Sequence, residues 1–321
     1  MTTLPARLPA CLMLAVLATP AVCLAAYPDR PINLIVPFPA GAGTDMTGRT
    51  IAQCMEKTMP GAQVVVMNRP GASGDIGLAA LAAAAPDGYT LGIVNTPGVV
   101  SIPIERPAKY TLDSFDFIAN LVDDPGTISV HADSPIHNIK DLVTAARARP
   151  DAVTVGTQGI GSAGHISALL LEQSAGITLS PVPFQGASPA RTALLGKVID
   201  STMANMGEAI TFQAGQPWRI LGVMSDTRSQ QSPDVPTFRE AGFDILAGSM
   251  RGLAAPKGLP PPVLSTLSKA VEQCSTDAEF VDRAKKTFQP LRYLGRDEYV
   301  SNLRQVDTQL RALWKVKPWN R

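Results

Sequence analysis

Apolar residues along the chain alternate between short runs of branched side chains and longer stretches with a helical period. The runs predict β-strands and the periodic stretches predict helices. The predicted strands are Ile32–Phe38, Gln63–Asn68, Tyr89–Thr96, Val153–Thr157, Thr178–Phe184, Val198–Met203 and Arg219–Ser225. The predicted helices are Thr44–Met59, Ile76–Ala85, Ile139–Arg149, Ser162–Ala175 and Pro189–Gly196. Strands separated by helices imply crossover connections, so the pattern predicts an α/β fold with largely parallel sheets.

The C-terminal part has a different pattern, with two amphipathic stretches. Their apolar residues recur at helical spacing, first at Val263, Leu264, Leu267 and Val271, and then at Tyr299, Leu303, Val306, Leu310 and Leu313. A single apolar stripe is typical of a helix that packs on a sheet. We therefore expect two covering helices here.

Composition restricts the class of protein. The chain has 321 residues, of which 45% are hydrophobic and only 5% aromatic, and its formal net charge is +1. Ample apolar residues exclude a disordered chain, and the length suggests about two domains. The balanced charge and the scarcity of aromatic residues exclude a nucleic-acid-binding protein.

The first 26 residues have the pattern of a secretory signal peptide. Arg7 is the only charge before Tyr27, the apolar run Leu8–Ala18 follows it, and the segment ends in small residues at Cys23–Ala26. The run is shorter than the ~20 residues that span a bilayer. We expect export, with the mature chain beginning near Tyr27 and carrying no net charge once Arg7 is lost. Lipid attachment at Cys23 is an alternative, although the preceding residues are a poor context for it.

Two cysteines remain in the mature chain. Cys54 and Cys274 could form a disulfide in an oxidising compartment, or they could be two separate buried small side chains. Spacing alone does not decide between these alternatives. The three histidines, His131, His137 and His165, lack the spacing of metal ligands, so we expect no metal site.

Two glycine-rich turns stand out because each joins a predicted strand to a helix. They are Val36–Asp45 (VPFPAGAGTD) and Gly156–His165 (GTQGIGSAGH). Unpaired N–H groups and the helix dipole attract an anion to a helix N-terminus, and small residues allow it to approach closely. Asp45 and Ser162 could instead only cap their helices. The two turns together predict one anionic ligand held from two sides, and Thr96, at the end of the third strand, is expected to face the same crevice.

The motifs of common enzymes and cofactor sites are incomplete in this chain. Gly159–Gly164 matches G-x-G-x-x-G, but no acidic residue lies between Glu172 and Asp200, where a dinucleotide site needs one. Phosphate-binding loops with Gly-Lys-Ser/Thr, G-x-S-x-G elbows and S-x-x-K are missing from the sequence. We expect no cofactor. A third glycine cluster, Asn68–Gly77, is interpreted as a tight connection with Asp75 near the start of its helix.

These segments occur in an order that resembles the periplasmic solute-binding receptors of tripartite tricarboxylate transporters, the Bug family. The resemblance covers nearly all of Tyr27–Trp314. Besides the first turn, its landmarks are Tyr27–Ile32 (YPDRPI), Asn68–Gly71 (NRPG), Ala85–Thr90 (APDGYT), Pro183–Gly186 (PFQG), Asp234–Thr237 (DVPT) and Gly252–Pro256 (GLAAP).

The resemblance implies a two-lobed, flytrap-like α/β fold of the periplasmic-binding-protein type, with two crossing strands between the lobes near Thr127–Val130 and Ser249–Ala255. Lobe 1 would comprise residues 27–126 and 250–321, and lobe 2 residues 127–249. The ligand's carboxylate would be held by both turns, through Gly41, Ala42, Gly43, Thr44 and Asp45 and through Gln158, Gly159, Ile160, Gly161, Ser162 and His165. Relatives often place Asp or Asn after the strand Val198–Met203, where this chain has Ala204 and then Asn205.

We therefore expect a monomeric, non-enzymatic periplasmic receptor that delivers a small organic carboxylate to membrane subunits of a tripartite tricarboxylate-type transporter. One alternative is an exported hydrolase or oxidoreductase that uses the same cleft. Another is a binding protein that serves a sensor kinase. Gln185, where relatives often have Lys, and Ala204 leave the identity of the ligand open.

Overall fold

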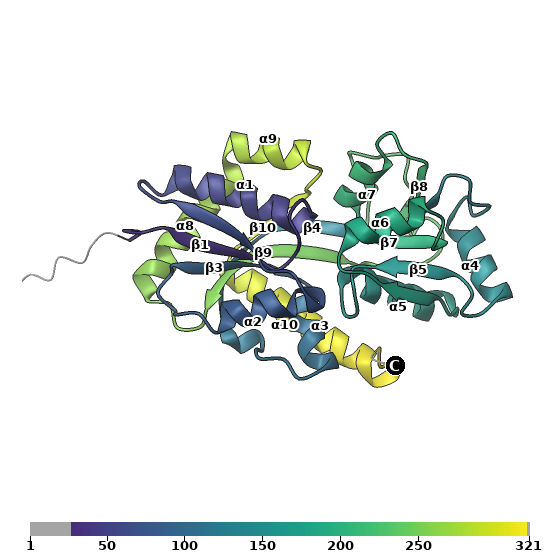
Figure 1. Ribbon diagram of the computed structural model, residues 1–321, viewed down its shortest axis with the longest axis horizontal. Coiled ribbons are helices and arrows are strands. Elements are labelled where there is room, and N and C mark those ends of the chain that lie inside the picture. Colours follow the sequence, from purple (N-terminus) through teal and green to yellow (C-terminus); the bar gives the residue numbers. More distant parts are fainter. Residues whose placement is uncertain (1–26, 320–321) are drawn as a thin grey trace, which may run out of the picture.

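The computed structural model describes residues 27–319, and the predicted signal peptide lies outside this range. Two lobes lie side by side along the long axis, each with a twisted sheet covered by helices (Figure 1). Within the described residues the strands form one continuous path, β2-β1-β3-β9-β4-β7-β5-β6, and β10 and β8 also pair with β4. The predicted α/β class and two-lobed architecture are confirmed.

The first lobe begins with parallel strands, as the apolar runs predict. Strands β1 (Ile32–Val36), β2 (Val64–Asn68) and β3 (Thr90–Asn95) are parallel, with β1 in the middle. One face carries α1 (Gly43–Thr58), α8 (Pro261–Thr276) and α9 (Ala278–Lys286), while the opposite core includes α2 (Asp75–Ala82), α3 (Gly98–Glu105) and α10 (Arg296–Val316). Short 3-10 turns lie at Ala72–Gly74 and Leu112–Ser114, and β10 (Leu291–Leu294) pairs with β4.

The second lobe has the same architecture as the first, parallel strands covered by helices, but it is smaller. Its strands are β5 (Thr154–Thr157), β6 (Ser180–Pro183), β7 (Ser201–Asn205) and β8 (Trp218–Val223), with β5 parallel to both β6 and β7. Its helices are α4 (Ile139–Ala148), α5 (Ala163–Ala175), α6 (Ala187–Leu195) and α7 (Met206–Gln213).

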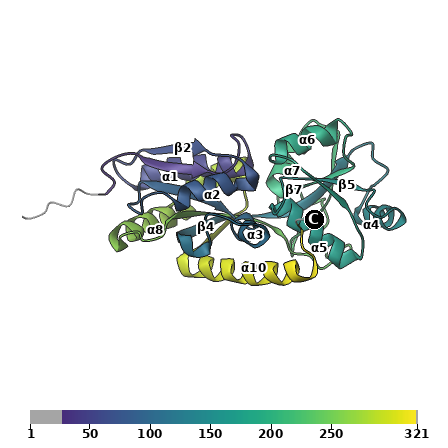
Figure 2. The same ribbon diagram turned by 60° about the horizontal axis from the view of Figure 1, so that its bottom comes forward.

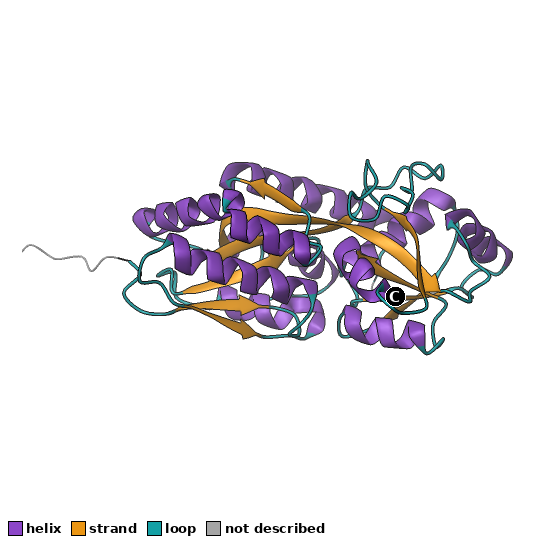
Figure 3. Cartoon of the chain, turned by 90° about the horizontal axis from the view of Figure 1, so that it is seen from above, coloured by secondary structure: helices purple, strands orange, loops and turns teal. Residues whose placement is uncertain are grey.

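Two long antiparallel strands connect the lobes, as expected. The first, β4 (Phe115–His131), pairs with β9 (Gly248–Pro256) up to Pro125 and from Gly126 onward pairs with β7 and β8. One strand thus belongs to both sheets. Seen from above, β4 runs through both lobes (Figure 3).

Helix α10 also reaches from one lobe to the other. Tyr299 and Leu303 pack in the core of the first lobe, and Leu310 and Leu313 belong to the same apolar cluster as Ile166 and Leu169 of α5. Figure 2 shows the helix lying along the underside of the molecule. The C-terminal apolar stripe is therefore a packing surface, as predicted, but it serves both lobes.

Cys54 and Cys274 form a disulfide that joins α1 to α8, with a Cα–Cα distance of 5.8 Å. Both residues are buried in the apolar core beside the first sheet. The sequence left open whether the two cysteines form a disulfide or are separate buried side chains, and in the structure they form the disulfide.

One predicted strand is displaced along the chain. The expected strand Val198–Met203 is β7, Ser201–Asn205, and Val198 is 75% exposed. Lys197 and Val198 donate backbone hydrogen bonds to Leu194 and Ala193 at the end of α6, so these residues belong to the turn after that helix. The apolar run therefore begins three residues before the strand that it predicted.

Candidate functional site

A small cavity of about 40 Å³ lies where the two lobes meet. Its wall combines the start of α1 (Ala42, Thr44) with the start of α5 (Gln158, Ser162, Ala163). The other lining residues are Phe38, Ser73, Asn95, Thr96, Gly98, Gly186, Ala187, Asn205, Glu208, Ser249 and Arg251. Residues of the two glycine-rich turns therefore line one shared space.

The first turn presents backbone donors to this space. Ala42 is the N-cap of α1 and its side chain makes no capping bond. Among the hydrogen bonds of the described residues, the N–H groups of Thr44 and Asp45 have no acceptor. The first N–H groups of a helix lack intrahelical partners, so these donors are free to bind an anion.

Asp45 holds the shape of this turn and is not part of the cavity wall. Its carboxylate accepts bonds from Gly41 N–H (2.9 Å), Arg49 Nε (2.9 Å) and Asn68 Nδ2 (2.8 Å). Burial alone would raise the pKa of Asp45, but these bonds hold it below its ordinary value. The negative charge of Asp45 is thus compensated by donors of the turn and of neighbouring side chains, and it stabilises the conformation of the turn.

The second turn is braced by its own side chains. Ser162 Oγ accepts a bond from His165 N–H (3.3 Å), and Gln158 Oε1 accepts one from Gly164 N–H (3.0 Å). Gln158 Nε2 also donates to the Met203 carbonyl at 2.7 Å, which ties the turn to β7. These contacts leave the Ala163 N–H without an acceptor among the described residues. The turn is rigid and offers one backbone donor beside the cavity.

His165 stabilises the second turn from behind. Its Nδ1 accepts the Gly161 N–H at 3.0 Å, and the ring is buried outside the cavity wall. Burial lowers the pKa of His165 to about 4, with a smaller contribution from nearby Lys317. The imidazole is therefore neutral near pH 7 and acts as an acceptor.

The remaining expected site residues fall into two groups. Thr96 and Asn205 line the cavity, whereas Gly41 and Gly43 line a second space of about 30 Å³ next to it. The others lie at or near contacts between the lobes: Ser101 Oγ of α3 donates to the Gly161 carbonyl at 2.5 Å, and a Cβ on Gly159 would lie 2.4 Å from Ser73 Oγ. Ile160 is 37% exposed and does not line either space.

The third glycine cluster has a role that sequence reasoning missed. Ser73, within this cluster, lines the cavity and has a positive φ of 61°. The interpretation as only a tight connection was therefore incomplete. The signal was available, since this cluster leads from the end of β2 into α2 and so lies on the same edge of the sheet as the first turn.

A buried ion pair beside the cavity was also missed. Arg251 Nη2 lies 2.9 Å from Asp124 Oδ2, and the two side chains are 2% and 1% exposed. Asp124 Oδ1 also accepts the Gly207 N–H of α7 at 3.1 Å. Burial raises the pKa of Asp124 to about 6, against the opposing effect of Arg251. A charge within the apolar strand at Arg251 was the available signal, because a buried charge requires a partner.

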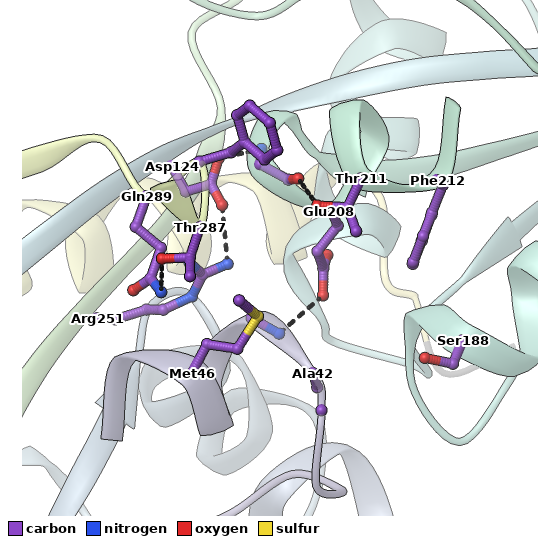
Figure 4. A pocket seen from close by; sticks show the side chains of 14 residues that line it. Ala42, Met46, Asp124, Ser188, Glu208, Thr211, Phe212, Arg251, Thr287 and Gln289 are labelled. Carbon is purple, nitrogen blue, oxygen red and sulfur yellow. Dashed lines mark hydrogen bonds and ion pairs between the residues drawn. The ribbon is translucent and has the colours of Figure 1, made fainter. Parts of the chain in front are cut away.

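Figure 4 shows this part of the site. Arg251 and Glu208 both extend toward the beginning of α1, near Ala42 and Met46. Arg251 comes from the connecting strand β9 and Glu208 from α7 of the second lobe. The two side chains and Ala42 line both small spaces and so separate one from the other.

Two further observations concern the described residues as a whole. No group of three or more His, Cys, Asp and Glu side chains in residues 27–319 is placed to hold a metal ion. None of the helices in this range is long and apolar enough to cross a membrane.

The two lobes, the two connecting strands and a cavity lined by both lobes define a periplasmic-binding-protein-like solute receptor. Residues 47–297 match the family described as tripartite tricarboxylate transporter family receptor. The match covers most of the chain, so the chain belongs to this family. The resemblance inferred from the glycine-rich turns and the other landmarks is confirmed.

Individual relatives agree with this assignment. Protein BugT of Bordetella pertussis is 31% identical over 251 residues, which are 77% of each chain. The solved periplasmic binding protein BugD is 32% identical with a TM-score of 0.81, and the alignment covers 90% of this chain and 98% of BugD.

Two solved structures from Rhodopseudomonas palustris contain ligands. Rpa4515 with adipate has a TM-score of 0.84 at 25% identity, with 90% of this chain and 97% of the other covered. MatC with bound malate has a TM-score of 0.82 at 25% identity, with 89% and 99% covered. Carboxylates are therefore ligands of proteins with this fold.

Proposed function

We propose that this protein is a non-enzymatic receptor for a small organic carboxylate and that it delivers this ligand to membrane subunits of a tripartite tricarboxylate-type transporter. The observation that carries the proposal is the pair of helix beginnings, from opposing lobes, that line one cavity. Backbone N–H groups at Thr44 and Ala163, two residues that line this cavity, supply donors for an anion. Adipate in Rpa4515 and malate in MatC support this ligand class.

Ligand entry would require the lobes to separate. A space of about 40 Å³ is close to the volume of a single water molecule, whereas ligand pockets measure ~300–1000 Å³. A hinge at the two connecting strands would widen the cleft, and a ligand that contacts both lobes would favour reclosure.

The proposal also includes the boundaries of the two lobes, the cellular location of the receptor and its oligomeric state. We divide the mature chain into lobe 1, residues 27–126 and 250–321, and lobe 2, residues 127–249, which places the first boundary within one residue of the point, between Pro125 and Gly126, where β4 changes its pairing partners. The protein would be exported by its N-terminal segment and act in the periplasm as a monomer. A receptor that serves a sensor kinase would have the same cleft but a different membrane partner, and genes for permease subunits beside its own gene would favour transport.

Ligand binding is tested first with the unmodified protein. The mature chain from Tyr27, unfolded and refolded to remove bound metabolites, is titrated by calorimetry with malate, adipate, succinate, acetate and, as a cationic control, ethanolamine. We expect heat of binding for at least one carboxylate and none for ethanolamine. A preparation that binds none of the carboxylates would refute the proposed ligand class, and turnover of a bound carboxylate would favour the exported enzyme.

The role of the α1 backbone is tested by removing one donor. Thr44 lies in the first turn, where proline is tolerated because its N–H is not used by the helix. We expect Thr44→Pro to weaken carboxylate binding about tenfold or more, since one charge-assisted hydrogen bond contributes roughly 1.5–3 kcal/mol. Thr44→Val is the matched control, because it also loses the hydroxyl that accepts from Asn95 Nδ2 but keeps the N–H. Equal affinities for the two variants would contradict the role of this donor.

A further inference from the structure

Glu208 places a carboxylate of the second lobe against the first helix of the other lobe. Its Oε1 accepts the Gly43 N–H at 3.4 Å, and its Oε2 accepts the Asn205 N–H, also at 3.4 Å. Gly43 is the first residue of α1. The side chain therefore presents, at this N-terminus, the same chemical group that a carboxylate ligand would bring. Both bonds are long, so the contact is one that a stronger acceptor can replace.

Arg251 adds an unsatisfied cation to the same place. Of its nitrogens, Nη2 pairs with Asp124, while Nε and Nη1 have no hydrogen-bond partner within residues 27–319. The guanidinium lies against the beginning of α1, because a Cβ on Gly43 would be 2.9 Å from Nη2. Buried donors of a charged group are costly to leave unpaired, so this side chain is suited to an anionic partner.

We propose that Glu208 occupies the anion site of the ligand-free protein, and that a ligand carboxylate displaces it to bind at Gly43 together with the free donors of Arg251. This inference rests on the proposed function and deepens it. Because Ala42, Glu208 and Arg251 separate the two small spaces, movement of Glu208 would also join them along the start of α1. The ligand would then be an elongated carboxylate whose chain reaches toward Met46 and Phe212, which line the second space.

The charges around Glu208 determine whether this residue strengthens or weakens the binding of a carboxylate ligand. Among residues that line the two spaces, the charged side chains are Asp124, Glu208 and Arg251. Asp124 and Arg251 neutralise each other, which leaves the negative charge of Glu208 beside the incoming carboxylate. Like charges at this distance repel, so Glu208 weakens binding and selects against ligands that do not replace both of its contacts.

The first experiment detects the contact between the Glu208 carboxylate and the Gly43 N–H in the ligand-free protein. The amide resonance of Gly43 is followed by ¹H–¹⁵N spectroscopy while the pH is lowered from neutral to acid values. We expect the Gly43 signal to shift with pH in the wild type and in Glu298→Gln, and to shift less in Glu208→Gln, where the neighbouring carboxylates Asp45 and Asp124 still respond to pH. Glu298 is a matched control because it is the third residue of α10, as Glu208 is of α7, but it is exposed and away from the cleft. An unchanged pH response in Glu208→Gln would overturn the inference, whether or not any ligand binds.

The second experiment measures displacement with malate and adipate as probes. We expect Glu208→Gln to bind the better probe about tenfold more tightly than the wild type at neutral pH, while Glu298→Gln binds like the wild type. Arg251→Gln is expected to bind about tenfold more weakly. The double variant Arg251→Gln with Asp124→Asn should show the same loss without leaving the Asp124 carboxylate unpaired.

The outcomes separate the two proposals. If the wild type binds a probe and Glu208→Gln binds it no better, displacement of Glu208 is wrong while the receptor function stands. If neither protein binds malate, adipate, succinate or acetate, the proposed function fails, and the response of the Gly43 amide still decides whether Glu208 occupies the start of α1.

Discussion

Single side chains at the two turns show how a backbone site is kept in shape. Asp45 binds Gly41 N–H of its own turn, and His165 binds Gly161 N–H of the other. Neither side chain lines the cavity, yet each holds a glycine-containing backbone in place. A site built from amides needs such supports, because glycine by itself leaves the backbone free to adopt many conformations.

The protonation of His165 should therefore affect stability. Burial lowers the pKa of the folded-state imidazole to about 4, while an unfolded chain has a value near 6.5. Between these values the unfolded state binds more protons, so stability is lost as the pH falls from about 6.5 to 4. We expect this residue to contribute a loss of about 2 kcal/mol between pH 7.5 and pH 5, as measured by denaturant unfolding.

The control for this prediction is His165→Asn, whose side-chain oxygen can still accept a bond. Its stability should fall less than that of the wild type between the same two pH values. The two proteins are otherwise identical, so the contributions of all other groups cancel in the comparison. An identical pH dependence of the two proteins would show that His165 does not couple protonation to folding.

The sequence predicts much of the backbone of the site but little of its side-chain pairing. Glycines at strand-to-helix junctions have a local signature, so both turns are correctly placed at the cleft. Glu208 and Gly43 are separated by 165 positions, and Arg251 and Asp124 by 127. Such pairs depend on how two lobes come together, which no local pattern encodes. The charge of Arg251 in an apolar strand could have shown only that a partner was needed.

At the scale of elements, the disulfide fixes α1 against α8. The bond joins residues 220 positions apart, so it restricts a very large loop in the unfolded chain. We expect the double variant Cys54→Ala, Cys274→Ala to lose about 3–5 kcal/mol of unfolding free energy. Carboxylate affinity should change little, because the cysteines lie toward the ends of the helices, away from the α1 N-terminus. Denaturant unfolding and calorimetry measure the two quantities, and unchanged stability would contradict the prediction.

Element prediction succeeded where periodicity was strong. The long helices α1, α5, α8 and α10 follow their apolar patterns, and so do the strands of both parallel sheets except the displaced β7. Four further elements, α3, α7, α9 and β10, were not predicted, and of β4 only the crossing near Thr127–Val130 was. Helix α3 contains Pro103, and β4 contains Pro125 and Gly126, residues that indicate breaks rather than regular structure. Tertiary pairing with β9 overrides that local signal in β4.

In the whole molecule, contacts between the lobes hold the cleft closed. Ser101 of α3 donates to Gly161 of the second turn, and Glu208 accepts from Gly43. Lys317, which follows α10, pairs with the buried Glu172 of α5. These contacts join the lobes both at the cleft and at α10, away from the cleft. The closed arrangement of the lobes is therefore stabilised by contacts within the protein as well as by the ligand.

Gly207, at the start of α7, lies close to the backbone of the other lobe. A Cβ at this position would lie 2.2 Å from the Phe288 carbonyl oxygen and 3.3 Å from Asp124 Oδ2. Because the first neighbour is backbone, it cannot move aside as a flexible side chain would. We expect Gly207→Ala to keep the lobes apart, which would increase the radius of gyration in solution scattering and weaken carboxylate binding at least tenfold. Gly295→Ala is the matched control, since its Cβ would meet no atom closer than 4.0 Å. If Gly207→Ala has wild-type dimensions and affinity, then the bound state does not use this approach of α7 to Phe288, and the lobes must close on the ligand in a different relative orientation.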